Sequence, residues 1–326
     1  MIITRTPLRI SIGGGGTDLP SYYEHRGGFC ISAAIDKYVY LSINTTFSDD
    51  YFLKYSELER VRKVADIRHP IIREAFVLHD VGPSIELVST ADMPTGTGLG
   101  SSGTFTVGLL RAIHALQRTP AVIHDLAAEA CHIEMDLLGE PCGKQDQYIA
   151  AYGGLTCFDF HPDGRVDARP LRVSAETLND LETHLLLFFT GYSRRASTIL
   201  QDQKDRSTAE DIAMLDNLDR TKAMGYQIRD SLEQGDCEAF GHLMHEHWMN
   251  KRGRSVGMSN DSIDNWYRSA LDAGAIGGKL VGAGAGGFLM VYAPDPQRVR
   301  AALADSGLAE VPFRFDLDGS IVLARS

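Results

Sequence analysis

The sequence predicts an α+β protein whose two domains share a cleft. The chain has 326 residues, which is more than one domain usually holds. Its pattern also changes: long β-like segments dominate the first half, whereas helical segments mixed with short strands follow Leu171. No internal repeat or low-complexity linker separates the halves. We therefore expect domains over residues 1–172 and 173–326 that pack against each other.

The first half is expected to combine long strands with two well-marked helices. Strands are expected over residues 2–12, 27–44 and 84–93, which alternate or are rich in β-branched and aromatic residues. Helical spacing runs from Ser102 to Leu116. A second helix is expected from Pro120 to Leu138, with Thr119 as N-cap and Gly139 as the C′ residue.

The second half is expected to alternate helices and short strands. The predicted strands cover residues 185–190, 288–292 and 319–324, and the predicted helices cover residues 207–234 and 263–273.

Composition limits the function classes. Hydrophobic residues make up 44% of the chain, enough for a buried core. We find neither an apolar run of membrane-spanning length nor a signal segment, and the five cysteines form no Cys-x-x-Cys pair. A cytoplasmic location with reduced thiols is expected. The net charge of −11 argues against nucleic acid or an anionic membrane as a general partner.

A glycine–serine loop is the strongest functional signal. Glycines remove Cβ atoms where a backbone approaches an anion, and the serines open a helix whose N-terminus favours phosphate. The predicted phosphate-binding residues are Gly96, Thr97, Gly98, Leu99, Gly100, Ser101 and Ser102. A Walker A loop is excluded because no Gly-Lys-Ser/Thr follows. A dinucleotide-binding turn is disfavoured because a helix, not a strand, comes next. An ordinary glycine-rich turn stays open.

A second glycine turn follows the first predicted strand. Arg9 lies on that strand, and Thr17 and Asp18 follow Gly13–Gly16. A cation and a carboxylate could thus face one site. Arg9 as an edge residue and Asp18 as a turn cap remain alternatives.

Two carboxylates are further candidates. Glu134 lies on the apolar face of its predicted helix, so it needs a cation or hydrogen-bond donors, and Mg²⁺ shared with a loop serine would serve. An arginine partner or partial exposure is the alternative. Asp146, beyond Gly139, could return to the same cleft and accept a hydroxyl proton. It could equally be an N-cap.

Three motifs, in order, resemble those of the GHMP kinases, the family of galactokinase, homoserine kinase and mevalonate kinase. They are Pro7–Gly13 with Thr17-Asp18, then Pro94–Ser102, then Lys279–Phe288. The resemblance spans Arg5 to Tyr292.

The resemblance implies a ribosomal-protein-S5-like N-terminal domain, a ferredoxin-like C-terminal domain and an active site between them. It implies ATP as co-substrate with Mg²⁺ held by Ser102 and Glu134. Asp146 then resembles the catalytic aspartate, and Arg9 the cation beside the transferred phosphoryl group. Asp18, with Thr17, Gly15 and Gly16, resembles the sugar-binding turn, and Gly284 of the C-terminal glycine loop is also expected to contact the substrate. The Glu134–Asp146 spacing is one residue longer than in mevalonate kinase, which leaves the metal ligand less certain.

Within the family, two segments are similar to the heptose 7-phosphate kinase subgroup. They are Thr6–Pro20 and Leu138–Tyr148, and the Gly-Glu-His turn of galactokinases is absent. The resemblance implies phosphorylation of the anomeric hydroxyl of D-glycero-D-manno-heptose 7-phosphate. The expected partners are ATP and a sugar phosphate, with a homodimer left open. The alternatives are a kinase for fucose, a hexose or another heptose phosphate, a non-catalytic sugar sensor and, least favoured, a dehydrogenase.

A phosphorylated acceptor needs a local basic site in this acidic chain. The predicted clamps are Lys144, Arg194 and Arg195, with Arg194 and Arg195 favoured because a Thr-Gly strand end precedes them. Lys251, Arg252 and Arg254 form another basic group. His242, His245 and His247 fit a helix better than a metal site.

Overall fold

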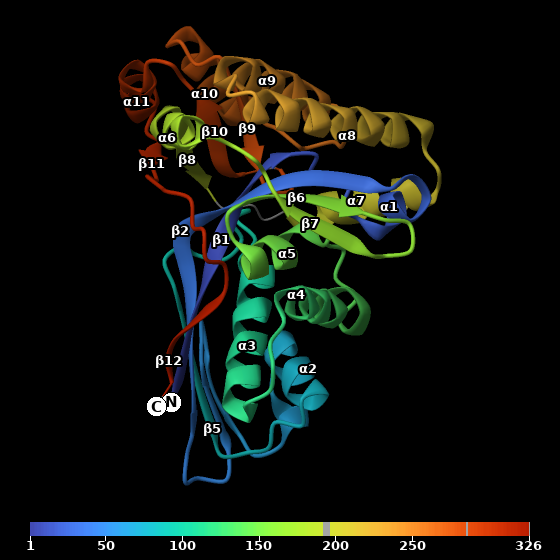
Figure 1. The fold of residues 1–326 in the computed structure, drawn as a ribbon, viewed down its shortest axis with the longest axis vertical. Coiled ribbons are helices and arrows are strands. Elements are labelled where there is room, and N and C mark those ends of the chain that lie inside the picture. Colours follow the sequence, from blue (N-terminus) through green and yellow to red (C-terminus); the bar gives the residue numbers. More distant parts are fainter. Residues whose placement is uncertain (192–195, 285, 326) are drawn as a thin grey trace.

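The computed structural model describes residues 1–191, 196–284 and 286–325, which form two sheets with their helices (Figure 1). Over these residues the first sheet has eight strands in the order β12-β1-β2-β5-β3-β4, with β6 on β2 and β7 on β6. The bounds are β1 Ile2–Gly13, β2 Gly28–Thr45, β3 Tyr51–Lys54, β4 Leu58–Val61, β5 Ile85–Ala91, β6 Leu155–Phe160, β7 Val166–Pro170 and β12 Ile321–Arg325. The segment expected as one or two strands is the single strand β2, which pairs with β6 and then with β5.

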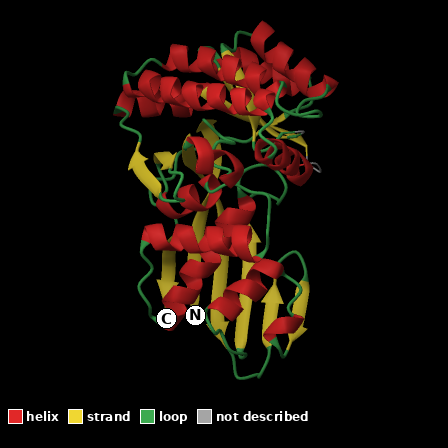
Figure 2. Ribbon diagram, turned by 90° about the vertical axis from the view of Figure 1, so that its right-hand side faces the viewer, coloured by secondary structure: helices red, strands yellow, loops and turns green. Residues whose placement is uncertain are grey.

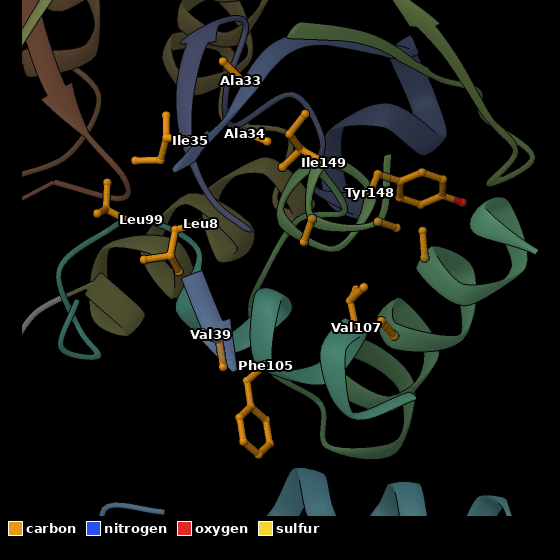
Figure 3. Close-up of a cluster of buried hydrophobic side chains, with 14 of the residues drawn as sticks. Leu8, Ala33, Ala34, Ile35, Val39, Leu99, Phe105, Val107, Tyr148 and Ile149 are labelled. Atoms are coloured by element: carbon orange, nitrogen blue, oxygen red, sulfur yellow. The ribbon is translucent and has the colours of Figure 1, made fainter. Parts of the chain in front are cut away.

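Helices cover one face of this sheet (Figures 1 and 2). They are α2 Pro70–Leu78, α3 Ser101–Gln117, α4 Ile123–Cys131 and α5 Gln145–Tyr152. Buried side chains from both layers meet between them, among them Leu8 and Val39 from the sheet and Val107 and Ile149 from the helices (Figure 3). Leu99 of the glycine–serine loop is fully buried in the same core. This apolar packing anchors the loop to the sheet.

The second sheet runs β11-β8-β10-β9 over the described residues. Its strands are β8 Leu185–Gly191, β9 Gly277–Val281, β10 Gly287–Tyr292 and β11 Ala309–Glu310. The accompanying helices are α6 Ala175–His184, α8 Ile212–Glu233, α9 Cys237–Arg252, α10 Asp261–Asp272 and α11 Pro296–Asp305. Two further helices, α1 Pro20–Arg26 and α7 Ala196–Thr208, pack on each other beside α8. Helix α8 also contacts β1 and β2, so it ties the two halves together (Figure 1).

The last strand returns to the first sheet. β12 covers most of the strand expected over residues 319–324 and extends to Arg325. It pairs antiparallel with β1, and the two chain ends lie side by side (Figures 1 and 2). A division after residue 172 therefore separates the two sheets except for this strand.

The predicted start of the second helix is wrong. Helix α4 begins at Ile123 after Val122, while the N–H of Thr119 donates to His114 O and closes α3. Arg118 has a φ of 57°, so the chain turns out of α3 there. Helix α4 continues directly into a π-helical turn, His132–Leu137. The chain then leaves the helix near Gly139, whose φ is 68°. In the described part of the chain, no helix is long and apolar enough to span a membrane.

Candidate active site

The glycine–serine loop joins β5 to α3 and has the backbone that phosphate binding requires. Gly96, Gly98 and Gly100 have φ values of 76°, 81° and 76°, in the left-handed region that favours glycine. Gly100 precedes the first residue of α3, so Ser101 and Ser102 lie in its first turn. The free N–H groups of a long helix are thus presented beside the loop.

The C-terminal glycine loop packs directly on the phosphate loop. A Cβ atom on Gly98 would lie 2.9 Å from Val281 O, and one on Gly282 would lie 2.7 Å from the Cα of Gly98. A Cβ on Gly287 would overlap Thr97 O. Side chains at these positions would push the two backbones apart. The third motif therefore braces the phosphate loop, while Gly284 packs against Met258.

Arg9 and Asp146 form a two-pronged ion pair beside this loop. Arg9 Nε donates to Asp146 Oδ1 at 2.7 Å and Arg9 Nη2 to Oδ2 at 2.8 Å. Arg9 Nη1 also donates to Gly98 O at 2.6 Å. The Arg9 side chain is buried, whereas 27% of the Asp146 side chain is exposed. The pair holds a carboxylate at the edge of the loop with one side open.

Glu134 lies in the π-helical turn and points at the start of α3. Ser102 Oγ donates to Glu134 Oε2 at 2.6 Å, and Gln147 Nε2 donates to Oε1 at 3.0 Å. Glu134 is 2% exposed, as its predicted place on the apolar face required. Burial raises the pKa of Glu134. No ion-pair partner of Glu134 is present among the described residues.

Asp18 forms the floor of a cavity that it shares with Asp146. Its carboxylate accepts from the N–H of Gly16 at 2.9 Å and of Gln145 at 3.1 Å. A side chain at Gly143 would overlap it. Burial raises the pKa of Asp18, and the nearby charge of Asp146 adds to this rise. Gly15, Gly16 and Gln145 line the same cavity.

Basic side chains from the C-terminal half form the opposite wall. Lys251 and Arg254 come from the end of α9 and the turn after it, and Lys279 comes from β9. All three are buried and line the cavity, together with His247 and Gln203. The sequence singled out Lys251 and Arg254 only as one basic group among several. It gave no sign that Lys279, His247 and Gln203 join them.

A separate hollow adjoins the outer side of the phosphate loop. Its lining combines loop residues with apolar and aromatic side chains, namely Val39, Tyr55, His69, Ile71, Met93 and Phe105. The His69 ring lies between Tyr55, 4.7 Å away, and Phe105, 4.9 Å away, measured between ring centroids. A flat ring fits such a surface. Sequence analysis missed this hollow, because its residues come from four separate segments.

The remaining predicted residues lie elsewhere or beyond the described chain. Thr17 is fully buried, and its hydroxyl accepts from the N–H of Phe29 at 3.0 Å, so it holds the turn. Lys144 Nζ donates to Gly164 O at 2.7 Å and lies outside the cavity lining. Arg194 and Arg195 fall outside the described residues.

Comparison with known proteins identifies the family. The model for the GHMP kinases N terminal domain matches residues 61–154, and that for GHMP kinases C terminal matches residues 228–307, together more than half of the chain. The chain belongs to the GHMP kinase family. This GHMP kinase is therefore an ATP-dependent kinase with the α+β fold expected from the sequence.

Similarity extends over the full length of several relatives. The chain is 29% identical over 334 residues to the D-glycero-α-D-manno-heptose 7-phosphate kinase of Campylobacter jejuni, covering 98% of this chain and 97% of that protein. It is 26% identical to the galactokinase of Thermococcus kodakarensis, covering 86% of each. The crystal structure of a D-glycero-D-manno-heptose 1-phosphate kinase from Bacteroides thetaiotaomicron superimposes with a TM-score of 0.80 at 24% identity, covering 100% of both chains.

Proposed function

We propose that this GHMP kinase transfers the γ-phosphoryl group of ATP to the C1 hydroxyl of D-glycero-D-manno-heptose 7-phosphate. The product is the 1,7-bisphosphate, a precursor for nucleotide-activated heptose and surface glycans. The observation that carries the proposal is one cavity that places Asp146, paired with Arg9, beside the phosphate loop and buries Asp18 at its floor. End-to-end similarity to the Campylobacter jejuni enzyme supports this acceptor.

The nucleotide is assigned to the loop and the aromatic hollow. The adenine ring takes the hollow beside Tyr55 and Phe105, and the loop amides and the N-terminus of α3 take the phosphates. Ser102 and Glu134 fit Mg²⁺, because a hydroxyl and a buried carboxylate that has no cationic partner among the described residues lie 2.6 Å apart. When bound there, the ion neutralises charge on the β- and γ-phosphates.

The acceptor is assigned to the cavity between Asp146 and Asp18. Asp146 orients the attacking hydroxyl and accepts its proton, while the guanidinium of Arg9 holds Asp146 in place and lies beside the transferred group. Asp18 accepts hydrogen bonds from sugar hydroxyls, since its two backbone donors leave lone pairs free. Positioning and charge neutralisation supply most of the acceleration.

An ADP-release screen tests the proposal. The acceptors are heptose 7-phosphate, heptose 1-phosphate, unphosphorylated heptose, galactose and fucose, and NMR of the product locates the new phosphate. The proposal expects the highest kcat/KM for heptose 7-phosphate and a new phosphate on C1. A higher kcat/KM for an unphosphorylated sugar, or phosphate added at another carbon, would reject the assigned acceptor.

A further inference from the structure

We infer that the basic wall of the cavity, formed by Lys251, Arg254 and Lys279, is an anion site that holds the phosphate already carried by the acceptor. This inference rests on the proposed function and names the residues that select a phosphorylated sugar. It moves that role from Arg194 and Arg195 to side chains on α9, the following turn and β9.

The first argument is that three buried basic side chains lack a contacting carboxylate over the described residues. Lys251, Arg254 and Lys279 are 7%, 3% and 2% exposed. Within residues 1–191, 196–284 and 286–325, no carboxylate lies within ion-pair distance of any of them, and Asp18, which raises the pKa of Arg254, acts on it only from a longer distance. A buried cation is costly unless it is paired. Three together, in a protein of net charge −11, point to a ligand that supplies the missing negative charge.

The second argument is the orientation of these groups by neutral acceptors. Lys251 Nζ donates to Gly282 O at 2.6 Å and Leu280 O at 3.1 Å, and Lys279 Nζ donates to Ile12 O at 2.8 Å. An ammonium has three donors, so the partners among the described residues use two donors of Lys251 and one of Lys279. Carbonyl groups therefore fix these ammonium groups without neutralising them.

Arg254 is held in the same way and borders the sugar-binding turn. Its Nε donates to Asn217 Oδ1 at 2.9 Å and its Nη2 to Thr221 Oγ1 at 2.7 Å. Its Nη1 lies against Gly16, where a Cβ atom would come within 2.5 Å. Gly16 also donates to Asp18. This contact places Arg254 beside the turn assigned to the acceptor, whereas Lys251, bonded to Gly282 O, lies nearer the glycine loop that packs on Gly98.

The third argument is an orphaned histidine in the same lining. His247 is 2% exposed, and over the described residues neither ring nitrogen has a hydrogen-bond partner in another residue. Such groups are rare in folded proteins and call for a ligand or water. His247 lines the cavity beside Lys251 and Lys279, where a phosphate oxygen would give it a partner.

The surroundings of these groups disfavour their charged forms. Burial and mutual repulsion of these cations lower the pKa of Lys279 to about 7 and also lower the pKa values of Lys251 and His247. A phosphate dianion would remove that repulsion. The neighbouring Arg252 differs, because its Nη2 donates to Asp264 at 2.6 Å. Arg252 thus provides a matched control of the same residue type, two positions from Arg254.

Steady-state kinetics with Arg254→Gln, Lys279→Met and the control Arg252→Gln test the inference. For heptose 7-phosphate, we expect KM to rise about 30-fold or more in the first two variants. The KM for ATP should change less than about threefold in all three, and the kcat/KM for unphosphorylated heptose should stay the same or rise in the first two variants. An equal loss of kcat/KM for both acceptors, or the same rise in KM in Arg252→Gln, would show that the basic wall does not bind the phosphate of the acceptor.

Inorganic phosphate provides a readout that needs no turnover. With the nucleotide site saturated by Mg²⁺-ADP, phosphate should raise the Tm of the wild type and of Arg252→Gln, but not of Arg254→Gln. This result would support the anion site even if the screen found no heptose kinase activity. If the variants do not fold, inhibition of the wild-type enzyme by inorganic phosphate is measured instead, at saturating ATP. Inhibition that is competitive with heptose 7-phosphate supports the site, and a lack of such inhibition overturns it.

Discussion

The two walls of the cavity differ in how their charged side chains are partnered. On the N-terminal side, Asp146 is paired with Arg9 through two hydrogen bonds, and Asp18 accepts from two backbone N–H groups. On the C-terminal side, the hydrogen-bond partners of Lys251 and Lys279 among the described residues are all carbonyl groups. The paired wall is complete before a ligand arrives, so it can fix the geometry of reacting groups. The unpaired wall is completed only by a ligand.

From this difference we expect the paired wall to act in phosphoryl transfer and the basic wall to discriminate among acceptors. A carboxylate held by a guanidinium keeps its position while a hydroxyl approaches, which favours proton transfer. Buried cations without counter-charges instead penalise every acceptor that lacks an anion, because their desolvation then goes uncompensated. We expect substitutions in the first wall to lower kcat and substitutions in the second to raise KM.

Replacing Asp146 should have the largest effect. Asp146→Asn keeps the shape of the side chain but removes the proton acceptor, so we expect kcat to fall about 10³-fold with little change in ATP affinity. Steady-state kinetics and a fluorescent-nucleotide titration measure the two quantities. Asp136→Asn, at a carboxylate 69% exposed in the π-helical turn, is the control. A kcat within tenfold of the wild type would rule out Asp146 as the acting carboxylate.

Removing the charge of Glu134 should have the next largest effect. Glu134→Gln retains partners for Ser102 and Gln147 but removes the only carboxylate that contacts Ser102 among the described residues. We expect the Mg²⁺ concentration for half-maximal rate to rise about 10- to 100-fold. Stability should be kept or improved, because a buried charge is lost. An unchanged Mg²⁺ titration would place the metal elsewhere.

The basic wall should make stability depend on pH in a defined direction. The pKa of Lys279 is about 7 when folded, against 10.5 for an ordinary lysine. Between pH 7 and 10.5 the unfolded chain therefore binds more protons, and the free energy of unfolding from this group increases with pH. Below pH 7 both states are protonated, and its destabilising contribution is constant. The charged and titratable groups near Lys279 are Arg9, Cys30, His247, Lys251 and Arg254.

Lys279→Met tests this dependence. In phosphate-free buffer the variant should be more stable than the wild type at pH 6.5, by about 2–4 °C in Tm, and the difference should shrink toward pH 9. Added phosphate should reduce the advantage of the variant at low pH, because it stabilises the protonated lysine of the wild type. A constant difference in Tm across this range would contradict the lowered pKa.

Replacing Lys144, a cation outside both walls, should have the smallest effect on kinetics. Lys144 Nζ donates to Gly164 O and lies 5.0 Å from the centroid of the Tyr23 ring, away from the cavity. We expect Lys144→Gln to change KM for heptose 7-phosphate less than about threefold and to lower stability by about 1 kcal/mol. Kinetics alongside Arg254→Gln would show the contrast. A similar rise in KM for both variants would indicate that Lys144 also binds the acceptor.

Sequence reasoning succeeded where function depends on a short segment. The glycine–serine turn at Gly96–Gly100, the start of α3 and the burial of Glu134 were predicted from neighbours in the chain. It was wrong at Thr119, because His114 O in the preceding helix takes the N–H that a new helix was expected to orient. A capping residue looks the same in sequence whether it opens one helix or closes another.

Local sequence was therefore sufficient to predict the glycine–serine turn, the start of α3 and the burial of Glu134, and three motifs in order were sufficient for the kinase family, because each of these features depends on residues close together in the chain. Tertiary packing alone decided which cations line the cavity. Lys251 and Lys279 are 28 positions apart in the chain, and they meet only because α9 packs along β9. The same packing directs Lys251 inward and leaves Arg252 on Asp264, since adjacent helix positions point about 100° apart.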